Sequence, residues 1–222
     1  MLIGPPGSGK GTQGKILAEK LMLPHISTGD IFRKIATNNT DESRLLYEYM
    51  DSGKLVPSEL VNKIVKTAIL SDDYKKGCIL DGYPRNLEQA EYLNKNVHAE
   101  ISCIFFNVPD EVAIKRIAGR YNCESCGSIY NKYYDNPKIE GICDKCGSIK
   151  LLFRSDDDEK TVLARMEEYK KETLPLVEYY KKKGRFFNIN ATANKEKVIE
   201  EIDLIAKRIW LYRIFLYYSD SN

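Results

Sequence analysis

Short apolar runs alternate along the chain with longer stretches in which apolar residues recur every three or four positions. The short runs predict buried strands, and the longer stretches predict helices. The predicted strands are Met1–Ile3, Cys78–Leu80, Ile101–Phe106 and Phe186–Ile189. The predicted helices are Lys10–Leu21, Glu59–Leu70, Asp110–Ala118 and Thr161–Lys182. Such alternation favours an α/β fold in which helices cover a parallel sheet.

The segment from Cys123 to Lys150 follows neither pattern, and it contains two similar halves that each read Cys-x-x-Cys-Gly-Ser-Ile. The paired cysteines are Cys123, Cys126, Cys143 and Cys146. Residues 127–142 separate the pairs, a spacing typical of a zinc ribbon. Four thiolates complete a tetrahedral shell and leave no position for a catalytic water, so the predicted Zn²⁺ is structural. Two disulfides or an iron–sulfur centre are the alternatives.

Composition narrows the class of protein. The 222 residues, 43% of them hydrophobic, suit one main domain with insertions. The formal charge of +2 gives no sign of a polyanion-binding protein. The chain opens on an apolar run and a glycine-rich loop, which leave no room for a signal peptide, so we expect a cytoplasmic location. An organelle is the alternative if the N-terminus is incomplete. Cys78 and Cys103 lie in apolar runs and are expected in the core.

The glycine-rich loop follows the first predicted strand, precedes the first predicted helix and reads Gly4-Pro5-Pro6-Gly7-Ser8-Gly9-Lys10-Gly11-Thr12. Glycines let backbone N–H groups turn inward around phosphate oxygens, and the helix N-terminus adds its positive dipole end. The pattern predicts a phosphate-binding loop in which Lys10 meets the β- and γ-phosphates. Gly11 takes the place of the usual hydroxyl residue, and the hydroxyl follows at Thr12.

A carboxylate and a guanidinium follow the second predicted strand. Asp81 comes at its carboxyl end, where open parallel sheets place their ligands. A carboxylate there suits the hydration shell of Mg²⁺, which keeps most of its waters in proteins. Arg85 can hold a phosphate with its planar fork of donors. A plain tight turn at Asp81-Gly82 is the structural alternative.

The Gly-Lys-Gly-Thr loop, followed by Gln13, resembles that of the nucleoside monophosphate kinases, and further motifs resemble the adenylate kinase branch. These motifs are Ser27-Thr28-Gly29-Asp30 with Arg33, Gly53-Lys54-Leu55-Val56, and Asp81-Gly82-Tyr83-Pro84-Arg85 with Gln89. The resemblance covers Met1 to about Lys207 and implies a five-stranded parallel core with two inserts. It places the core at 1–26, 57–118 and 157–207, the acceptor insert at 27–56, the zinc-binding lid at 119–156 and a C-terminal extension at 208–222.

The resemblance implies reversible, Mg²⁺-dependent phosphoryl transfer from ATP to AMP by a monomer, giving two ADP and maintaining adenine nucleotide balance. The residues it places at ATP are Gly7, Ser8, Gly9, Lys10, Gly11, Thr12, Arg116, Arg120, Ile129, Tyr130 and Ala193. Those it places at AMP are Thr28, Arg33, Lys54, Leu55, Val56, Gly82, Tyr83, Pro84, Arg85, Gln89, Arg154 and Arg165. The expected catalytic residues are Lys10, Asp81, Arg85, Arg120, Arg154 and Arg165.

The many arginines suit this reaction, because phosphoryl transfer needs alignment and positive charge more than covalent chemistry from the protein. Arg116 and Arg120 lie four residues apart, so they would share one face if the helix that begins at Asp110 extends that far.

Kinases with other substrates are the nearest alternatives, with GTP as donor or with UMP or CMP as acceptor. Uridylate/cytidylate kinases tend to carry alanine in place of Thr28 and asparagine in place of Gln89, so both residues favour AMP. Asn86 is more typical of the pyrimidine branch, and Tyr83 replaces the commoner phenylalanine.

Two alternatives belong to other classes. A zinc ribbon also suits a nucleic-acid-binding ATPase. The near-neutral charge, and the lack of a glutamate directly after Asp81 to position water, argue against that class. A non-catalytic nucleotide sensor would be expected to lack Lys10, Arg85 or Arg120, and all three are present.

The C-terminal extension carries five aromatic residues, Trp210, Tyr212, Phe215, Tyr217 and Tyr218. It is shorter than the ~20 apolar residues that a membrane span needs. Its basic residues would spread around a helix rather than form one polar face. We expect it to pack on the core or against a second chain, with a frayed end as the alternative.

Overall fold

The computed structural model describes residues 1–38, 40–71, 74, 76–97 and 100–219, with the backbone alone for residues 155 and 212–219. Within this part of the chain, five strands form the central sheet: β1 (Leu2–Ile3), β2 (His25–Ser27), β3 (Ile79–Asp81), β4 (Cys103–Asn107) and β8 (Phe186–Asn190). Their order is β2-β3-β1-β4-β8, and every neighbouring pair is parallel. The predicted parallel α/β sheet is confirmed.

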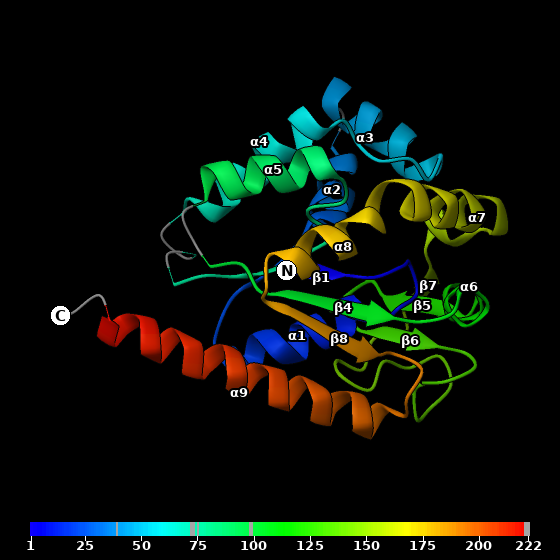
Figure 1. Ribbon diagram of the computed structural model, residues 1–222. Helices are drawn as coiled ribbons and strands as arrows, with labels where there is room; N and C mark the ends of the chain where they lie inside the picture. The colour runs from blue at the N-terminus through cyan, green and yellow to red at the C-terminus, as the bar shows by residue number, and fades with distance from the viewer. Residues whose placement is uncertain (39, 72–73, 75, 98–99, 220–222) are drawn as a thin grey trace.

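Both faces of the sheet are buried by helices (Figure 1). Leu2, Ile79 and Ile104 point to one face, where they join α1 (Lys10–Leu21) and α9 (Lys195–Ser219) in one apolar cluster. Alternate strand residues point to the other face and pack with α4 (Ser58–Ile69), α5 (Leu87–Asn96) and α8 (Pro175–Lys182). Burial of one aliphatic side chain stabilises a fold by about 1.5–3 kcal/mol, so two-sided burial favours continuous apolar strands.

The predicted helices are largely confirmed, with one correction. The bounds of α1 and α6 (Asp110–Ala118) agree with prediction, and α4 is displaced by one residue. The predicted single helix Thr161–Lys182 is wrong, since α7 (Glu159–Glu168) passes through a π-helical turn, η3 (Tyr169–Thr173), into α8. Pro175 has no N–H, and its ring clashes with the carbonyl four residues back in a regular helix. The Leu174 N–H accordingly donates to the Tyr169 carbonyl at 2.8 Å, closing a wider turn.

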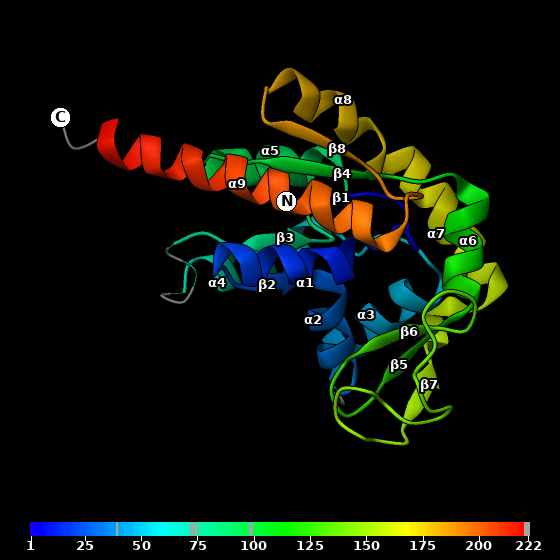
Figure 2. The same cartoon turned by 90° about the horizontal axis from the view of Figure 1, so that it is seen from below.

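Several elements had too weak a sequence pattern to be predicted from periodicity. The strand β2 has only three residues, and α3 (Asp41–Asp51) lies in a polar stretch. The lid segment contains an antiparallel sheet of β5 (Arg120–Cys123), β6 (Ile129–Asn131) and β7 (Leu151–Phe153), followed by the short turn η2 (Ser155–Asp157). This small sheet lies apart from the central sheet (Figure 2). It agrees with the expected inserted module.

The last helix, α9, continues through the predicted C-terminal extension to Ser219. Ile209 packs against the core, whereas Trp210 is 50% exposed and Leu211 is 61% exposed. The predictions for Tyr212, Phe215, Tyr217 and Tyr218 fall on side chains outside those described. Within the described ranges, none of the helices combines the length and the apolar character that crossing a bilayer requires.

Candidate active site

The glycine-rich loop joins β1, the middle strand of the sheet, to the N-terminus of α1. Gly7 and Gly9 have φ angles of 79° and 85°, which L side chains rarely adopt. A Cβ on Gly7 would lie 2.3 Å from the Ala113 carbonyl oxygen, so glycine also lets the loop pack closely on α6. No side chain caps the N-terminus of α1. Its first N–H groups therefore face the loop as an anion-binding end.

Lys10 lies where the loop, the end of β3 and several arginines meet. Its Nζ donates a hydrogen bond to the Pro5 carbonyl at 3.2 Å. Burial lowers the pKa of Lys10 to about 8; the charge of Asp81 opposes this shift, and Arg85, Arg165 and Arg120 add to it. An anion at this point would relieve the repulsion among these cations, as the phosphates of a nucleotide do.

Asp81 ends β3 and is buried, with its backbone in register with Leu2 and Ser27. A Cβ atom on Gly11 would lie 3.1 Å from the Asp81 Oδ2 atom, which is closer than Cβ atoms usually approach a neighbouring heavy atom. This closeness explains glycine directly after the loop lysine. Because β2 runs beside β3, Thr28 also reaches this point, and its Oγ1 donates to the Gly82 carbonyl at 2.8 Å.

Asp156 and Asp157 of η2 gather arginines from separate elements. The Arg120 Nε and NH2 atoms donate to the two Asp157 carboxylate oxygens at 2.7 and 2.5 Å. Arg165 NH1 donates to Asp156 Oδ2 and to Asp157 Oδ1, both at 3.1 Å. The NH1 atom of Arg33, on α2 (Thr28–Ala36), lies 3.9 Å from Asp156 Oδ2. The two carboxylates thus hold together cations that would otherwise repel one another.

Arg116 and Arg120 do not share a helix face, because the condition that the helix extend as far as Arg120 is not met. The helix α6 ends at Ala118, Gly119 caps it, and Arg120 begins β5. Arg116 instead donates from NH2 to the Ala191 carbonyl at 2.8 Å, next to the loop that carries Ala193. Arg120 therefore turns toward η2, while Arg116 stays with the loop after β8.

Arg85 and Arg154 are strongly desolvated. Burial, followed by the nearby charge of Arg165, lowers the pKa of Arg85 to about 10. Burial lowers the pKa of Arg154 to about 9, with Arg120 as the next cause. Arg85 is also held in place, because its backbone N–H donates to Gln89 Oε1 at 2.8 Å and its Nε to the Gly82 carbonyl at 3.0 Å. Desolvated guanidinium groups in fixed positions suit a phosphate ligand.

A cleft opens beside these arginines between α2, the chain around Lys54, and α7. Its described lining is Gly29, Phe32, Arg33, Met50, Gly53, Lys54, Leu55, Val56, Val61, Gly82, Arg85, Gln89, Asp156 and Arg165. Most of the expected AMP contacts are thus brought together. Thr28, Tyr83, Pro84 and Arg154 are not part of that lining; the Tyr83 hydroxyl donates to Asn62 Oδ1 at 2.7 Å inside the core.

Some residues of the cleft carried no functional signal in the sequence. Phe32, Met50 and Val61 are apolar helix residues, and only their helical spacing could have placed them on an inward face. Asp156 stood beside the predicted arginines, but one of its two partners, Arg33, comes from a distant part of the sequence, and the other, Arg165, from the following helix. The acceptor insert is tied to α7 as well, because the Leu55 N–H donates to Glu168 Oε1 at 3.2 Å.

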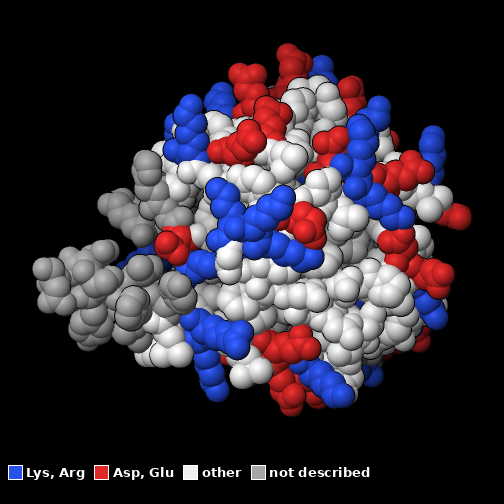
Figure 3. Space-filling view, viewed as in Figure 1, with Lys and Arg blue, Asp and Glu red and all other residues white. Residues whose placement is uncertain are grey.

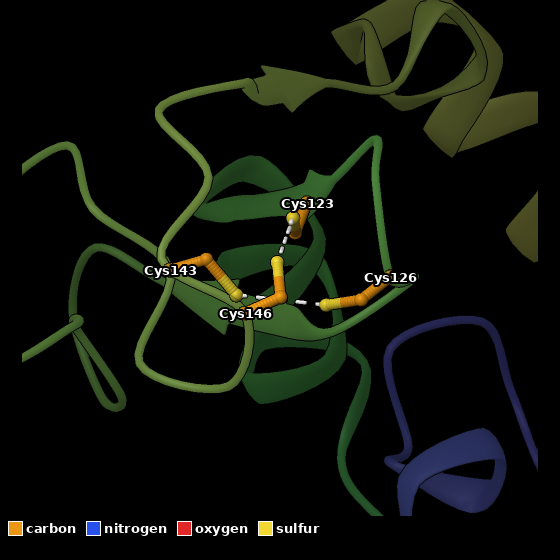
Figure 4. Close-up of side chains that lie close together, drawn as sticks. All are labelled: Cys123, Cys126, Cys143 and Cys146. Carbon is orange, nitrogen blue, oxygen red and sulfur yellow. Dashed lines mark hydrogen bonds between the residues drawn. The ribbon is translucent and has the colours of Figure 1, made fainter.

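The four lid cysteines point toward one common centre (Figure 4). Their sulfur atoms all lie within 4.8 Å of one another, with 3.5 Å between Cys123 and Cys146 and 3.6 Å between Cys126 and Cys143. Sulfur atoms about 2.3 Å from a tetrahedral zinc lie about 3.8 Å apart, whereas disulfide sulfurs lie about 2.05 Å apart. All six cysteines are described and free. The sulfur cluster therefore fits a tetrahedral metal ion, and not the alternative of two disulfides.

The comparison with known proteins agrees with this geometry. Residues 2–185 match the family model described as adenylate kinase. The adenylate kinase of Rickettsia conorii is 48% identical over 207 residues, which cover 93% of this chain and 98% of that protein. The adenylate kinase of Rickettsia prowazekii is 47% identical over 208 residues, with the same coverage. The chain belongs to the adenylate kinase family.

Adenylate kinases are phosphotransferases that use a magnesium–nucleotide complex, and this chain transfers a phosphoryl group from ATP to AMP to give two ADP. The fold class and the activity expected from the resemblance are therefore confirmed. The chain binds ATP, AMP and ADP. The four cysteines form a cluster that could hold a metal ion.

Proposed function

We propose that the cleft beside α2 binds AMP and that the glycine-rich loop binds the phosphates of ATP. One observation carries this assignment: the loop and the cleft adjoin. A Cβ on Gly11 of the loop would lie 3.1 Å from Asp81, and a Cβ on the next residue, Gly82 of the cleft, would lie 3.1 Å from Arg85 NH2. The charges of Arg85 and Arg165 accordingly help to lower the pKa of Lys10. A phosphoryl group passing between the two sites would therefore remain among fixed cations. In-line transfer requires such a shared boundary, because donor and acceptor oxygens must approach the same phosphorus atom.

The proposed division of roles follows the geometry. Arg33, Arg85 and Arg165 line the cleft and would hold the AMP phosphate. Lys10 and Arg120 would stabilise charge on the transferred group, with Arg154 beside them. On the donor side, Arg116 would lie near the base, with Ile129, Tyr130 and Ala193 covering the nucleotide. These cations can act strongly, since burial weakens solvent screening.

Asp81 is the proposed anchor for the magnesium that accompanies ATP. Its carboxylate is buried at the strand end beside Gly11, in a cradle that any Cβ at position 11 would narrow. One carboxylate suits Mg²⁺, which retains several of its waters in such sites. When bound, the ion would neutralise charge on the phosphates. The role of Asp81 would be to orient the hydrated ion toward the loop.

We propose that Gln89 recognises the base of the acceptor nucleotide. It lines the cleft, and its Oε1 accepts from the Arg85 N–H at 2.8 Å. We expect wild type to use AMP faster than CMP or UMP, and Gln89→Asn to lower kcat/KM for AMP relative to CMP by roughly tenfold, because a shortened amide leaves polar groups unpaired. Thr67→Ala, which alters an exposed hydroxyl on α4, serves as the control. If CMP or UMP outpaces AMP in wild type, the acceptor assignment fails.

We propose that the lid holds one structural Zn²⁺ through Cys123, Cys126, Cys143 and Cys146. Elemental analysis of the purified protein should find about one equivalent, because four thiolates fill a tetrahedral shell. Cys143→Ser should lose the metal and melt earlier, yet retain part of the activity. Cys78→Ser, outside the cluster, should keep its metal. Complete loss of activity in a Cys143→Ser protein with an intact, nucleotide-binding core would argue for a metal that takes part in the chemistry.

We also propose that the protein is a cytoplasmic monomer. Its core would comprise residues 1–26, 57–118 and 157–207, its acceptor insert residues 27–56 and its lid residues 119–156. Basic and acidic side chains are interspersed over the face in Figure 3, with no broad area of one sign. That face therefore lacks the basic stripe that would be the electrostatic footprint of a nucleic-acid-binding ATPase.

A further inference from the structure

The hydroxyl of Tyr130 makes two contacts at the metal centre. Tyr130 lies on β6 and is 7% exposed. Its hydroxyl oxygen lies 3.3 Å from the Cys143 Sγ and 2.7 Å from the backbone nitrogen of Asp144. One side chain from the strand therefore reaches both a cysteine of the second pair and the residue that follows it.

The direction of these hydrogen bonds follows from the donors available. The Asp144 N–H can only donate, so the tyrosine oxygen accepts there. A cysteine that binds a metal ion does so as a thiolate and carries no proton. The hydroxyl proton of Tyr130 is then directed at the Cys143 sulfur, and it is the donor of a charge-assisted hydrogen bond.

The two cysteine pairs are otherwise built alike. Gly127 N–H donates to the Cys123 carbonyl at 2.9 Å, and Gly147 N–H donates to the Cys143 carbonyl at 2.8 Å. They differ in their attachment, because Cys123 is the last residue of β5, whereas Cys143 lies in an irregular segment between β6 and β7. The Tyr130 hydroxyl links that irregular segment to the small sheet. The first pair needs no such link, since β5 carries Cys123 directly.

We propose that Tyr130 is a positioning residue of the metal centre: its hydroxyl orients the Cys143 thiolate, raises the metal affinity and fastens the second cysteine pair to β6. The proposal rests on the proposed zinc site. Outer-shell hydrogen bonds of this kind typically change metal affinity by about 10–100-fold when they are removed. Because Tyr130 belongs to the strand proposed to cover ATP, the metal would also fix the position of that strand.

The test compares Tyr130→Phe with Tyr121→Phe. Tyr121 is a matched control, because its ring stacks on that of Tyr130, with 5.8 Å between the ring centroids. Its hydroxyl donates instead to Asn136 Oδ1 at 2.8 Å, in an exposed position away from the cysteines. Zinc affinity is measured on full-length protein by competition with a chromophoric chelator. We expect the zinc dissociation constant to rise about tenfold or more in Tyr130→Phe and to stay within about twofold of wild type in Tyr121→Phe.

The spectrum of the cobalt(II)-loaded protein distinguishes loss of the hydrogen bond to the Cys143 thiolate from loss of the hydrogen bond to Asp144. Removing a hydrogen bond to a thiolate raises the energy of its lone pair, so the sulfur-to-cobalt charge-transfer band should move to lower energy in Tyr130→Phe alone. An unchanged band and affinity in a folded Tyr130→Phe protein would overturn the proposal while leaving the zinc site intact. A wild-type chain that binds no metal would overturn both.

Discussion

Lys10→Ala lowers kcat by roughly 10²–10³-fold on this account, the range seen when one preorganised group that stabilises transition-state charge is removed. Lys10 extends from the first turn of α1 into a cluster that includes Asp81, Arg85 and Arg120. Its charge is fixed before the reaction begins, so little reorganisation is needed when charge develops on the transferred group. Steady-state rates with saturating ATP and AMP measure the effect.

The control for this variant is Lys15→Ala, an exposed lysine on the same helix, which should keep wild-type kcat. The pH profile adds an independent reading. Lys10 loses its proton as the pH rises through its pKa of about 8, so kcat/KM for ATP should fall above that pH. Lys10→Arg should lack this decline, because arginine stays charged. A Lys10→Ala enzyme with near-normal kcat would refute the assigned role.

Stability should respond to pH in the opposite direction. Between pH 8 and 10.5 an unfolded lysine keeps its proton while the buried Lys10 has lost it, so the unfolded state binds more protons. The contribution of Lys10 to the free energy of unfolding therefore rises with pH between pH 8 and 10.5. A fall in activity there is therefore distinguishable from unfolding by melting curves recorded at the same pH values.

Arg120→Ala should lower kcat in both reaction directions, again by roughly 10²–10³-fold. Arg120 lies on β5, at the start of the lid. Its Nε and NH2 atoms are held by hydrogen bonds to the Asp157 carboxylate at 2.7 and 2.5 Å. Arg120→Lys should recover only part of the rate, since an ammonium keeps the charge but lacks the two-pronged geometry. Arg208→Ala, an exposed arginine of α9, is the matched control.

Arg120→Ala also leaves the buried Asp157 with one cation fewer, although Arg165 still contacts it at 3.1 Å. Melting temperature and nucleotide binding must therefore be measured on each variant. A folded, nucleotide-binding Arg120→Ala protein that turns over at nearly the wild-type rate would remove Arg120 from the mechanism.

The sequence predicted features whose chemistry is local. The phosphate loop and the cysteine pairs each occupy one short segment, and the structure places the loop at the end of β1 and the four sulfur atoms together. The strands buried on both faces were also predictable, because a short, continuous apolar run is typical of a strand that helices cover on both sides. The π-helical turn before Pro175 was missed, since helical periodicity continues across it.

Features that depend on distant residues could not be predicted in the same way. Asp156 and Asp157 are adjacent in the sequence, yet their partners Arg33, Arg120 and Arg165 come from three other elements. The spacing of Arg116 and Arg120 does not reveal that Arg120, beyond the end of that helix, turns toward Asp157. The contact between Tyr130 and Cys143 likewise follows from the fold of the lid and not from its cysteine spacing.

Phosphoryl transfer from ATP to AMP is observed most directly by following phosphorus-31 resonances in a mixture of purified protein, Mg²⁺, ATP and AMP. We expect that one ATP and one AMP disappear for every two ADP formed, and that ADP alone regenerates ATP and AMP. ADP should form without a matching rise in inorganic phosphate. ATP loss that releases phosphate and leaves AMP unchanged would rule out transfer to AMP, because it would make the chain a hydrolase.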